Sequence, residues 1–147
     1  MNRLQHITAL SHEFGTPDYL IGGGGNTSCK DEANLWIKPS GTALSTISAG
    51  DFVQVDRQRL ARLYDWSPPN DMQRREANVK EILQQAVAGA ADNTGRPSVE
   101  TPLHDSFEAV YVIHTHPPLV NGMTCAQQGA EACSRLFPKA LWIPYCD

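Results

Sequence analysis

The segment 111–117, YVIHTHP, places two histidines one residue apart at the end of an apolar, β-branched run. Such a run favours a β-strand, and side chains at alternate positions of a strand share one face, so His114 and His116 lie on the same side. Their ring nitrogens can then converge on one point, as a divalent metal requires of two ligands. Pro117-Pro118 ends the strand pairing and leaves both rings at the rim of a sheet. Two exposed or hydrogen-bonded histidines on an edge strand explain this pattern equally well, so the metal interpretation depends on the rest of the chain.

A run of four glycines, Gly22 to Gly25, precedes Asn26-Thr27-Ser28. Consecutive glycines cost backbone entropy, and a folded chain keeps them where it turns sharply or approaches another group closely. Bare N–H groups followed by small hydrogen-bond donors suit a phosphate or a carboxylate. No Gly-Lys-Ser/Thr follows, which excludes a Walker loop, and a tight hairpin or bulge explains the glycines as well as an anion site does. Pro39–Thr42 is a second small-residue corner with similar donors, among them Ser40 and Gly41.

Hydrophobic periodicity predicts the other elements. Apolar residues at helical spacing predict helices over 3–14 and 71–90, with Asp71 as a cap of the longer one, and one or two short helices within 121–137. A short basic helix is expected over 57–64. Alternating or β-branched segments predict strands over 35–38, where a hairpin forms, over 52–55, and from Leu141 to Ile143.

The segment 98–104, SVETPLH, is the second stretch that carries candidate chemistry. It predicts a helix capped by Ser98 or Thr101, with Pro102 in its first position, that ends near residue 107. Glu100 then stands at or just before the helix N-terminus, where a carboxylate is favoured on electrostatic grounds alone. The functional alternative makes it a general base or a metal ligand. His104, one turn later, either orients that carboxylate or packs beneath it, whereas His6 and His12 on the first helix are expected to be solvated.

Composition narrows the class of protein. A chain of 147 residues, 41% hydrophobic, fits one globular domain, and a net charge of −4 gives no basic excess for nucleic acid or an anionic membrane. The longest apolar run, 109–113, is far too short to span a bilayer, and no secretory signal begins the chain, so a cytoplasmic location is expected. The four cysteines form no CxxC pair, which favours free thiols over a disulfide scaffold.

Four motifs in a fixed order resemble those of the class II aldolase/adducin family, above all the sugar-phosphate aldolases that act on fuculose and rhamnulose 1-phosphates. Each motif is loose by itself, but their order and separation over residues 15–145 are hard to obtain by accident. The motifs are Gly25-Asn26-Thr27-Ser28, Pro39-Ser40-Gly41-Thr42, Ser98-x-Glu100-x-x-x-His104 and His114-Thr115-His116-Pro117.

The resemblance implies an α/β fold, a three-layer α/β/α sandwich with a largely antiparallel central sheet. It also implies Zn²⁺ or another divalent metal, a small-molecule sugar phosphate as substrate, and a ring-shaped homotetramer, as in many members. By position, His114 and His116 match metal ligands, and Glu100 matches the acid that ligates the resting metal and shuttles protons. The positions that match phosphate contacts are Gly25, Asn26, Ser40, Gly41 and Ser98; Val99 stands where the aldolases often have a second serine.

The family's aldolases take a third histidine ligand from a segment after the Ile-Pro-Tyr stretch, and this sequence ends at Asp147. The resemblance therefore implies that residues 1–147 form a class II aldolase/adducin-like domain without its C-terminal part. The alternatives are a fragment, a natural truncation, or a variant that completes the metal coordination sphere with water or with a neighbouring subunit. The implied reaction is cleavage of a sugar phosphate to dihydroxyacetone phosphate and an aldehyde through a zinc-stabilised enediolate. Epimerases, dehydratases and decarboxylases use the same site, and adducin-like members keep the fold as a non-catalytic assembly module.

Overall fold

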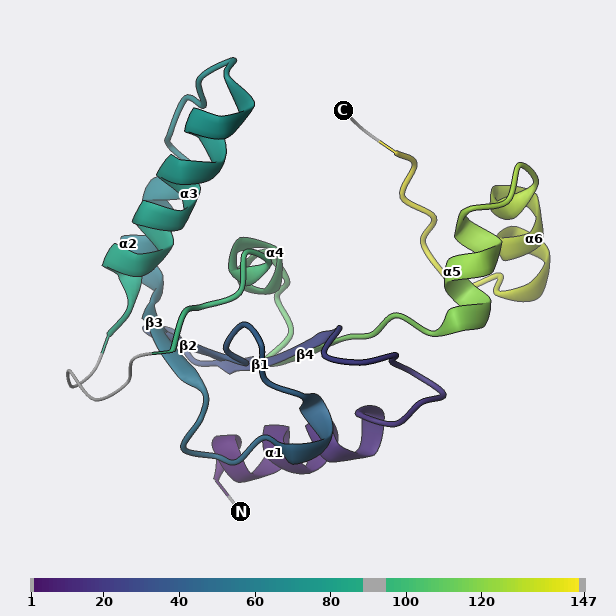
Figure 1. Ribbon diagram of the computed structural model, residues 1–147, viewed down its shortest axis with the longest axis horizontal. Helices are drawn as coiled ribbons and strands as arrows, with labels where there is room; N and C mark the ends of the chain where they lie inside the picture. The colour runs from purple at the N-terminus through teal and green to yellow at the C-terminus, as the bar shows by residue number, and fades with distance from the viewer. Residues whose placement is uncertain (1, 89–94, 146–147) are drawn as a thin grey trace.

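The computed structural model describes residues 2–88 and 95–145, and a four-stranded sheet lies at its centre (Figure 1). The strand order is β3-β2-β1-β4, and each neighbouring pair is antiparallel. The strands are β1 (Asn26–Lys30), β2 (Asn34–Ile37), β3 (Val53–Asp56) and β4 (Tyr111–His114). Because β1 is central, it contacts β2 on one side and the histidine-bearing strand β4 on the other.

Helix α1 (Arg3–Phe14) covers one face of the sheet. It begins with a reciprocal capping box, in which the side chains of Asn2 and Gln5 each accept a hydrogen bond from the other's backbone N–H. Ile7 is fully buried and packs with Cys29 of β1 in a small core that also includes Ile47. The predicted helix over 3–14 is confirmed.

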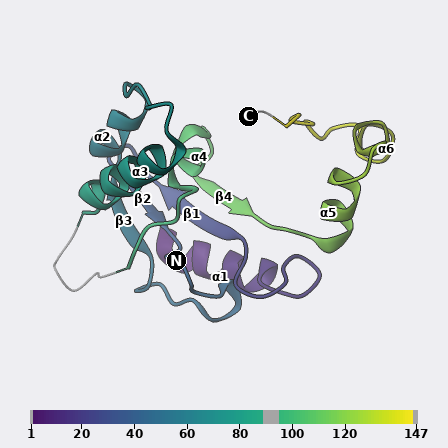
Figure 2. The same cartoon turned by 45° about the horizontal axis from the view of Figure 1, so that its top comes forward.

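Helices α2 (Arg57–Leu60) and α3 (Met72–Ala86) cover the opposite face at the β2–β3 end (Figure 2). Alternation along the strands turns one set of side chains towards these helices, and they form the larger core. Its buried members are Leu35, Ile37, Val53, Val55, Leu60, Leu83 and Ala86. Asp71 caps α3 as predicted, but the helix ends at Ala86, and residues 89–90 of the predicted span lie outside the described residues. The basic segment 57–64 forms α2 and a following 3₁₀ turn, η2 (Ala61–Leu63).

Helix α4 (Thr101–Ser106) lies on the same face as α2 and α3, over β1. Lys30, at the end of β1, is buried and donates from Nζ to backbone carbonyls at the end of α4, those of His104, Asp105 and Phe107. A lysine that satisfies terminal carbonyls stabilises the end of a helix. With α1 on one face and α2, α3 and α4 on the other, the predicted three-layer α/β/α architecture with an antiparallel sheet is confirmed.

Three local predictions are wrong. Neither Ser98 nor Thr101 caps α4, because Glu100 occupies the N-cap position and Pro102 is the second helical residue rather than the first. The two prolines do not end the strand that carries both histidines, because β4 already ends at His114 and His116 lies beyond it. The segment from Leu141 to Ile143 is not a strand, because an apolar segment becomes one only where a neighbouring strand offers a hydrogen-bonding ladder; both of those side chains are strongly exposed instead.

Helices α5 (Pro118–Thr124) and α6 (Gly129–Leu136) pack on each other beyond the end of β4, away from the sheet (Figures 1 and 2). They correspond to the helices predicted within 121–137. Among the described residues, no helix has the length and apolar character needed to cross a bilayer. Cys29, Cys125 and Cys133 are free thiols, as expected, and Cys146 lies outside the described residues.

Candidate metal and anion site

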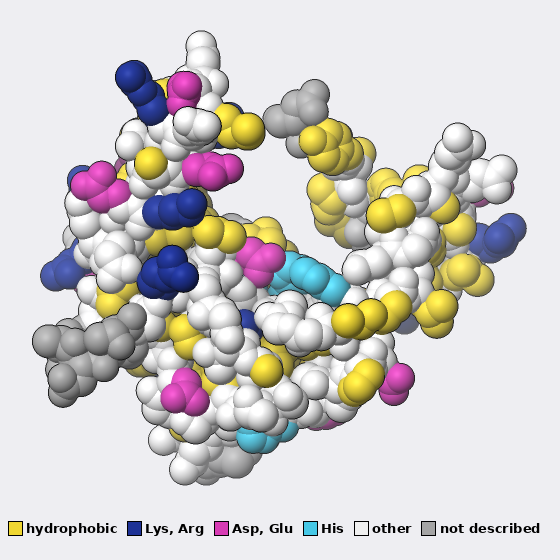
Figure 3. Space-filling view, in the orientation of Figure 1, with side chains coloured by type: hydrophobic (Ala, Val, Ile, Leu, Met, Phe, Trp, Pro, Cys, Tyr) yellow, Lys and Arg dark blue, Asp and Glu magenta, His cyan; other side chains and the backbone are white. Residues whose placement is uncertain are grey.

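The two histidines of the HTH motif converge. His114 is the last residue of β4, and His116 follows it with its backbone N–H donating to the carbonyl of Tyr19 at 3.0 Å. Their Nε2 atoms lie 2.9 Å apart. Figure 3 shows histidine side chains exposed in the hollow between the sheet layers and the C-terminal helices, beside an acidic side chain. The structure thus brings both rings to one accessible point at the rim of the sheet.

Glu100 reaches the same point from α4. Its Oε2 lies 3.2 Å from Nδ1 of His114, and its side chain is 31% exposed. Glu100, His114 and His116 each offer one ligand atom within 4.8 Å of the others. The carboxylate therefore lies on the same side of the sheet as the two imidazoles, although Glu100 lies fourteen positions before His114.

These residues fit a divalent cation. Two imidazole nitrogens and a carboxylate oxygen form a donor set that zinc accepts in proteins. His114 Nδ1 is buried and makes no hydrogen bond in the described part of the chain, its contact with Glu100 being at ion-pair distance but outside hydrogen-bond geometry. Nε2 of His114 thus faces His116 and Nδ1 faces Glu100, so the ring of His114 lies between the other two donor groups. Two hydrogen-bonded neutral histidines, one donating to the other through Nε2, are the simpler alternative.

Asn26 connects the glycine-rich corner to Glu100. It is the first residue of β1, pairs with His114 across the sheet and is 4% exposed. Its Nδ2 donates to Ser98 Oγ at 2.6 Å and to Glu100 Oε2 at 2.8 Å. Ser98 Oγ in turn accepts from the backbone N–H of Glu100 at 3.2 Å. Two residues that the motif match assigned to phosphate therefore contact each other and the candidate base.

The pKa of Glu100 reflects this environment. Burial raises it, but the hydrogen bond from Asn26 and the neighbouring His114 lower it more, and the net pKa lies below the ordinary value of a glutamate. Glu100 is therefore ionised at neutral pH, which is the form that ligates a cation or accepts a proton.

Gly25 is required by the geometry of this corner. Its φ of +71° is disfavoured for residues with a side chain. An added Cβ would lie 2.5 Å from Cδ2 of Leu20 and 2.8 Å from the carbonyl oxygen of His114. The absence of a side chain thus lets the glycine-rich turn pack directly against the end of β4.

The second corner lies beside the segment that leads into α4. Ser40 donates its backbone N–H to the carbonyl of Arg96 at 3.0 Å, and Pro39 bridges to Pro97. Ser40 and Gly41 are exposed, and Gly41 has a φ of +86°. The structure thus joins this corner to the backbone next to Ser98, while no hydrogen bond links Ser40 or Gly41 directly to the histidines within the described ranges.

Two residues of this region were not among the predicted site residues. Lys38 is 3% exposed, and its Nζ donates to the carbonyl of Thr42 at 2.7 Å, which closes the second corner. Burial lowers its pKa, and the negative charge of Glu100 acts in the opposite sense. A lysine that ends an alternating strand and directly precedes Pro-Ser-Gly was the available sequence signal.

His104 is fully buried, and its Nδ1 lies 2.8 Å from Ser28 Oγ. No described side chain bonds its Nε2. Burial, together with the nearby His114, lowers the pKa of His104 to about 4, so the ring is neutral at physiological pH. Of the two sequence interpretations, packing beneath Glu100 agrees with these contacts, since the Nδ1 partner is Ser28 rather than the carboxylate.

Comparison with known proteins identifies the family. The sequence profile of the Class II Aldolase and Adducin N-terminal domain matches residues 5–146, so the chain belongs to this family, as the four motifs predicted. An uncharacterized oxidoreductase of Bacillus subtilis (strain 168), YuxG, is 29% identical over 135 residues, which are 84% of this chain and 18% of YuxG.

Solved structures share the fold. The N-terminal class II aldolase domain of a conserved protein from Thermoplasma acidophilum superposes with a TM-score of 0.76 at 23% identity, over 91% of this chain and 64% of that one. YgbL from Escherichia coli, described as an aldolase/epimerase/decarboxylase candidate, gives a TM-score of 0.56 at 17% identity, over 84% and 48% of the two chains. The chain thus spans less than two thirds of the length of each of these proteins.

Proposed function

We propose that this chain is part of a metal-dependent aldolase that cleaves a sugar phosphate to dihydroxyacetone phosphate and an aldehyde. The observation that carries the proposal is the meeting of Glu100, His114 and His116, with ligand atoms within 4.8 Å of one another, beside a corner of small donors. Family membership supports an enzyme of this general kind, and YgbL is described in terms of the same group of reactions.

In this proposal His114 and His116 hold Zn²⁺ or a similar divalent ion, and Glu100 completes the resting site. When bound, such a cation would supply Lewis-acid stabilisation of the enediolate left on the dihydroxyacetone phosphate half. Glu100, ionised at neutral pH, exchanges the proton at the carbon where the bond is broken. Backbone N–H groups at Gly25 and Gly41, with the side chains of Asn26, Ser40 and Ser98, hold the substrate phosphate.

Epimerisation, dehydration or decarboxylation of a sugar phosphate is the alternative within the same site. The same carboxylate can move a proton in each of these reactions, so the geometry supports a metal site with a base more strongly than it supports cleavage as the particular reaction. Product analysis separates them, because only an aldolase releases dihydroxyacetone phosphate from a ketose 1-phosphate. A non-catalytic adducin-like role is less well supported, since it does not explain why two imidazoles and a carboxylate converge.

Calorimetric titration with zinc tests the metal site directly. We expect binding to the wild-type chain and a loss of affinity of at least about tenfold in the double variant His114→Ala/His116→Ala. The matched control is His6→Ala/His12→Ala, which removes two histidines from α1 and leaves β4 intact. Equal zinc binding by the wild-type chain and the His114/His116 variant would refute the proposed metal site.

A further inference from the structure

Both N–H bonds of the Asn26 side-chain amide are already used. Nδ2 donates to Ser98 Oγ at 2.6 Å and to Glu100 Oε2 at 2.8 Å. An amide nitrogen carries two hydrogens, so no donor remains for a third acceptor. The carboxylate also fixes the orientation of the amide, because the opposite orientation would place the amide oxygen against the carboxylate oxygen.

The acceptor end of the same amide is unpaired. Asn26 Oδ1 is buried and has no hydrogen-bond partner in the described part of the protein. Leaving a buried acceptor unpaired is unfavourable, and the two hydrogen bonds that Nδ2 donates offset this cost. The side chain is therefore oriented for its two donors, one of which restrains the candidate base.

We propose that Asn26 is a positioning residue that holds Glu100 while no anion is bound, and that the substrate's phosphate group releases Glu100 by taking over the N–H of Asn26. The proposal rests on the proposed function, in which Asn26 and Ser98 contact the phosphate and Glu100 contacts the metal. It adds a regulatory step to that function, since the same hydrogen cannot serve the phosphate and Glu100 together.

Of the two hydrogen bonds that Asn26 donates, the one to Glu100 is the bond that an anion breaks. A phosphate dianion and a carboxylate repel each other, whereas a serine hydroxyl can donate to the phosphate. The side chain of Glu100 is 31% exposed and has room to move, while Ser98 is 7% exposed and fixed by its neighbours. Anion binding at the glycine-rich corner and the position of Glu100 at the cation site are thus coupled, and by linkage the coupling acts in both directions.

Cobalt and sulfate test this coupling without turnover. Co²⁺ replaces zinc because its visible absorption depends on the number and type of its ligands, and sulfate serves as the tetrahedral dianion. In the wild-type chain we expect saturating sulfate to alter the cobalt spectrum and to change the cobalt dissociation constant by about fivefold or more.

The variant Asn26→Ala separates a positioning role from a role in phosphate binding alone. If Asn26 positions Glu100, the variant binds cobalt about 10–100-fold more weakly, and its spectrum before sulfate addition already resembles that of the sulfate-treated wild type. Asn26→Gln keeps both donors on a longer side chain and should partly restore the sulfate-free spectrum. Asn34→Ala is the matched control, because Asn34 begins the adjacent strand β2 and its side chain accepts a hydrogen bond from Gln54 away from the site.

The outcomes separate this inference from the proposed function. If cobalt and sulfate both bind, by calorimetry, and the wild-type spectrum does not respond to sulfate, the coupling is refuted while the metal site stands. An unchanged sulfate-free spectrum and cobalt affinity in a folded Asn26→Ala variant refutes the positioning role in the same way. Failure of cobalt to bind the wild-type chain overturns the proposed function and the coupling together, and failure of sulfate to bind overturns the coupling.

Discussion

The hydroxyl of Ser28 lies 2.8 Å from Nδ1 of His104, and this buried contact joins the central strand to the helix that follows Glu100. Ser28 and Asn26 occupy alternate positions of β1 and so share a face of the sheet. One face of β1 thus contacts α4 at successive points, through Asn26 to Glu100, through Ser28 to His104, and through Lys30 to the carbonyls that end α4. The position of the candidate base is therefore determined by β1 as much as by its own helix.

We expect His104 to make the protein lose stability as the pH falls from about 6.5 to about 4. Its pKa is lowered from 6.5 to about 4 in the folded chain, so within this window the unfolded chain binds a proton that the folded chain does not. Unfolding is favoured progressively, by about 3 kcal/mol in total from this residue. Urea denaturation at pH 7.0 and pH 4.5 measures the effect. His104→Asn keeps a polar group near Ser28 but does not titrate, so it should lose less stability than the wild type between these two pH values. The control is His6→Asn, at an exposed position of α1. Equal losses of stability in the wild type and in His104→Asn would contradict the prediction.

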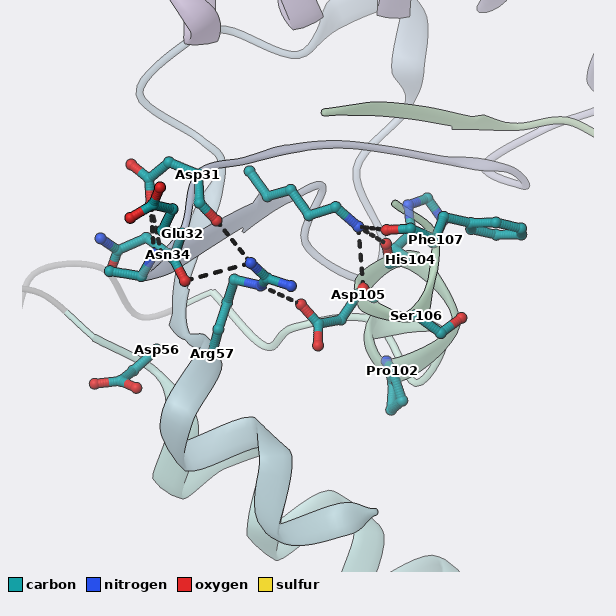
Figure 4. A network of polar contacts seen from close by, with 12 residues as sticks. Asp31, Glu32, Asn34, Asp56, Arg57, Pro102, His104, Asp105, Ser106 and Phe107 are labelled. Carbon is teal, nitrogen blue, oxygen red and sulfur yellow. Dashed lines mark hydrogen bonds and ion pairs between the residues drawn. The ribbon is translucent and has the colours of Figure 1, made fainter. Parts of the chain in front are cut away.

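Arg57→Met should destabilise the fold through Asp105. Arg57 Nε donates to Asp105 Oδ1 at 2.5 Å (Figure 4). The side chain of Asp105 is 8% exposed. Removal of the guanidinium takes the Arg57 ion pair from a buried carboxylate and leaves it the hydrogen bond from Tyr64, whose hydroxyl lies 3.1 Å away and whose pKa is raised to about 12 by burial and by this carboxylate. We expect a loss of about 2–4 kcal/mol in the free energy of unfolding, measured by denaturant titration.

The control for that variant is Arg59→Met. The side chain of Arg59 is 60% exposed, and its Nε lies 3.7 Å from Asp56 Oδ2. Exposed ion pairs of this kind contribute about 0–1 kcal/mol to the free energy of unfolding. If the two variants lose similar amounts of stability, the burial of Asp105 does not strengthen its ion pair with Arg57, and the prediction is wrong.

Gly25→Ala should damage both the stability of the chain and the position of His114. The added methyl group would overlap Leu20 and the carbonyl of His114, and the residue would have to keep a φ of +71°. We expect at least about 1–3 kcal/mol of destabilisation from the backbone alone, together with weaker zinc binding by calorimetry. Gly23→Ala is the matched control in the same glycine run, because a Cβ there meets nothing within 4 Å. A Gly25→Ala variant as stable as Gly23→Ala would refute the assigned role of Gly25.

Lys38→Met should weaken anion binding more than metal binding. Lys38 Nζ donates to the carbonyl of Thr42 and so holds the corner that contains Ser40 and Gly41. Without this bond the backbone donors of the corner lose their fixed arrangement, and we expect phosphate affinity, followed by ³¹P NMR on the metal-free chain, to fall about fivefold or more. Lys80→Met, an exposed lysine on α3, is the control. The prediction fails if both variants bind phosphate as the wild type does.

The sequence by itself determined most of the elements and the family. Periodicity predicted α1 and the start of α3, because helical spacing depends only on the geometry of the local backbone. The sequence also predicted that His114 and His116 converge, and they do, although β4 ends at His114 and His116 lies just beyond the strand. Local spacing could not say that Leu141 to Ile143 lacks a strand partner, since a ladder requires a neighbour from elsewhere in the chain.

Only the tertiary structure decided which residues meet. Asn26 and Glu100 are 74 positions apart, and no periodicity predicts that the amide of one restrains the carboxylate of the other. The burial of Lys38 and His104, and the lowered pKa that burial gives each of them, likewise arise from layers packed across the sheet. The reason is physical: a motif fixes which chemical groups are present, whereas hydrogen bonds and desolvation depend on distances that exist only after distant segments have packed together.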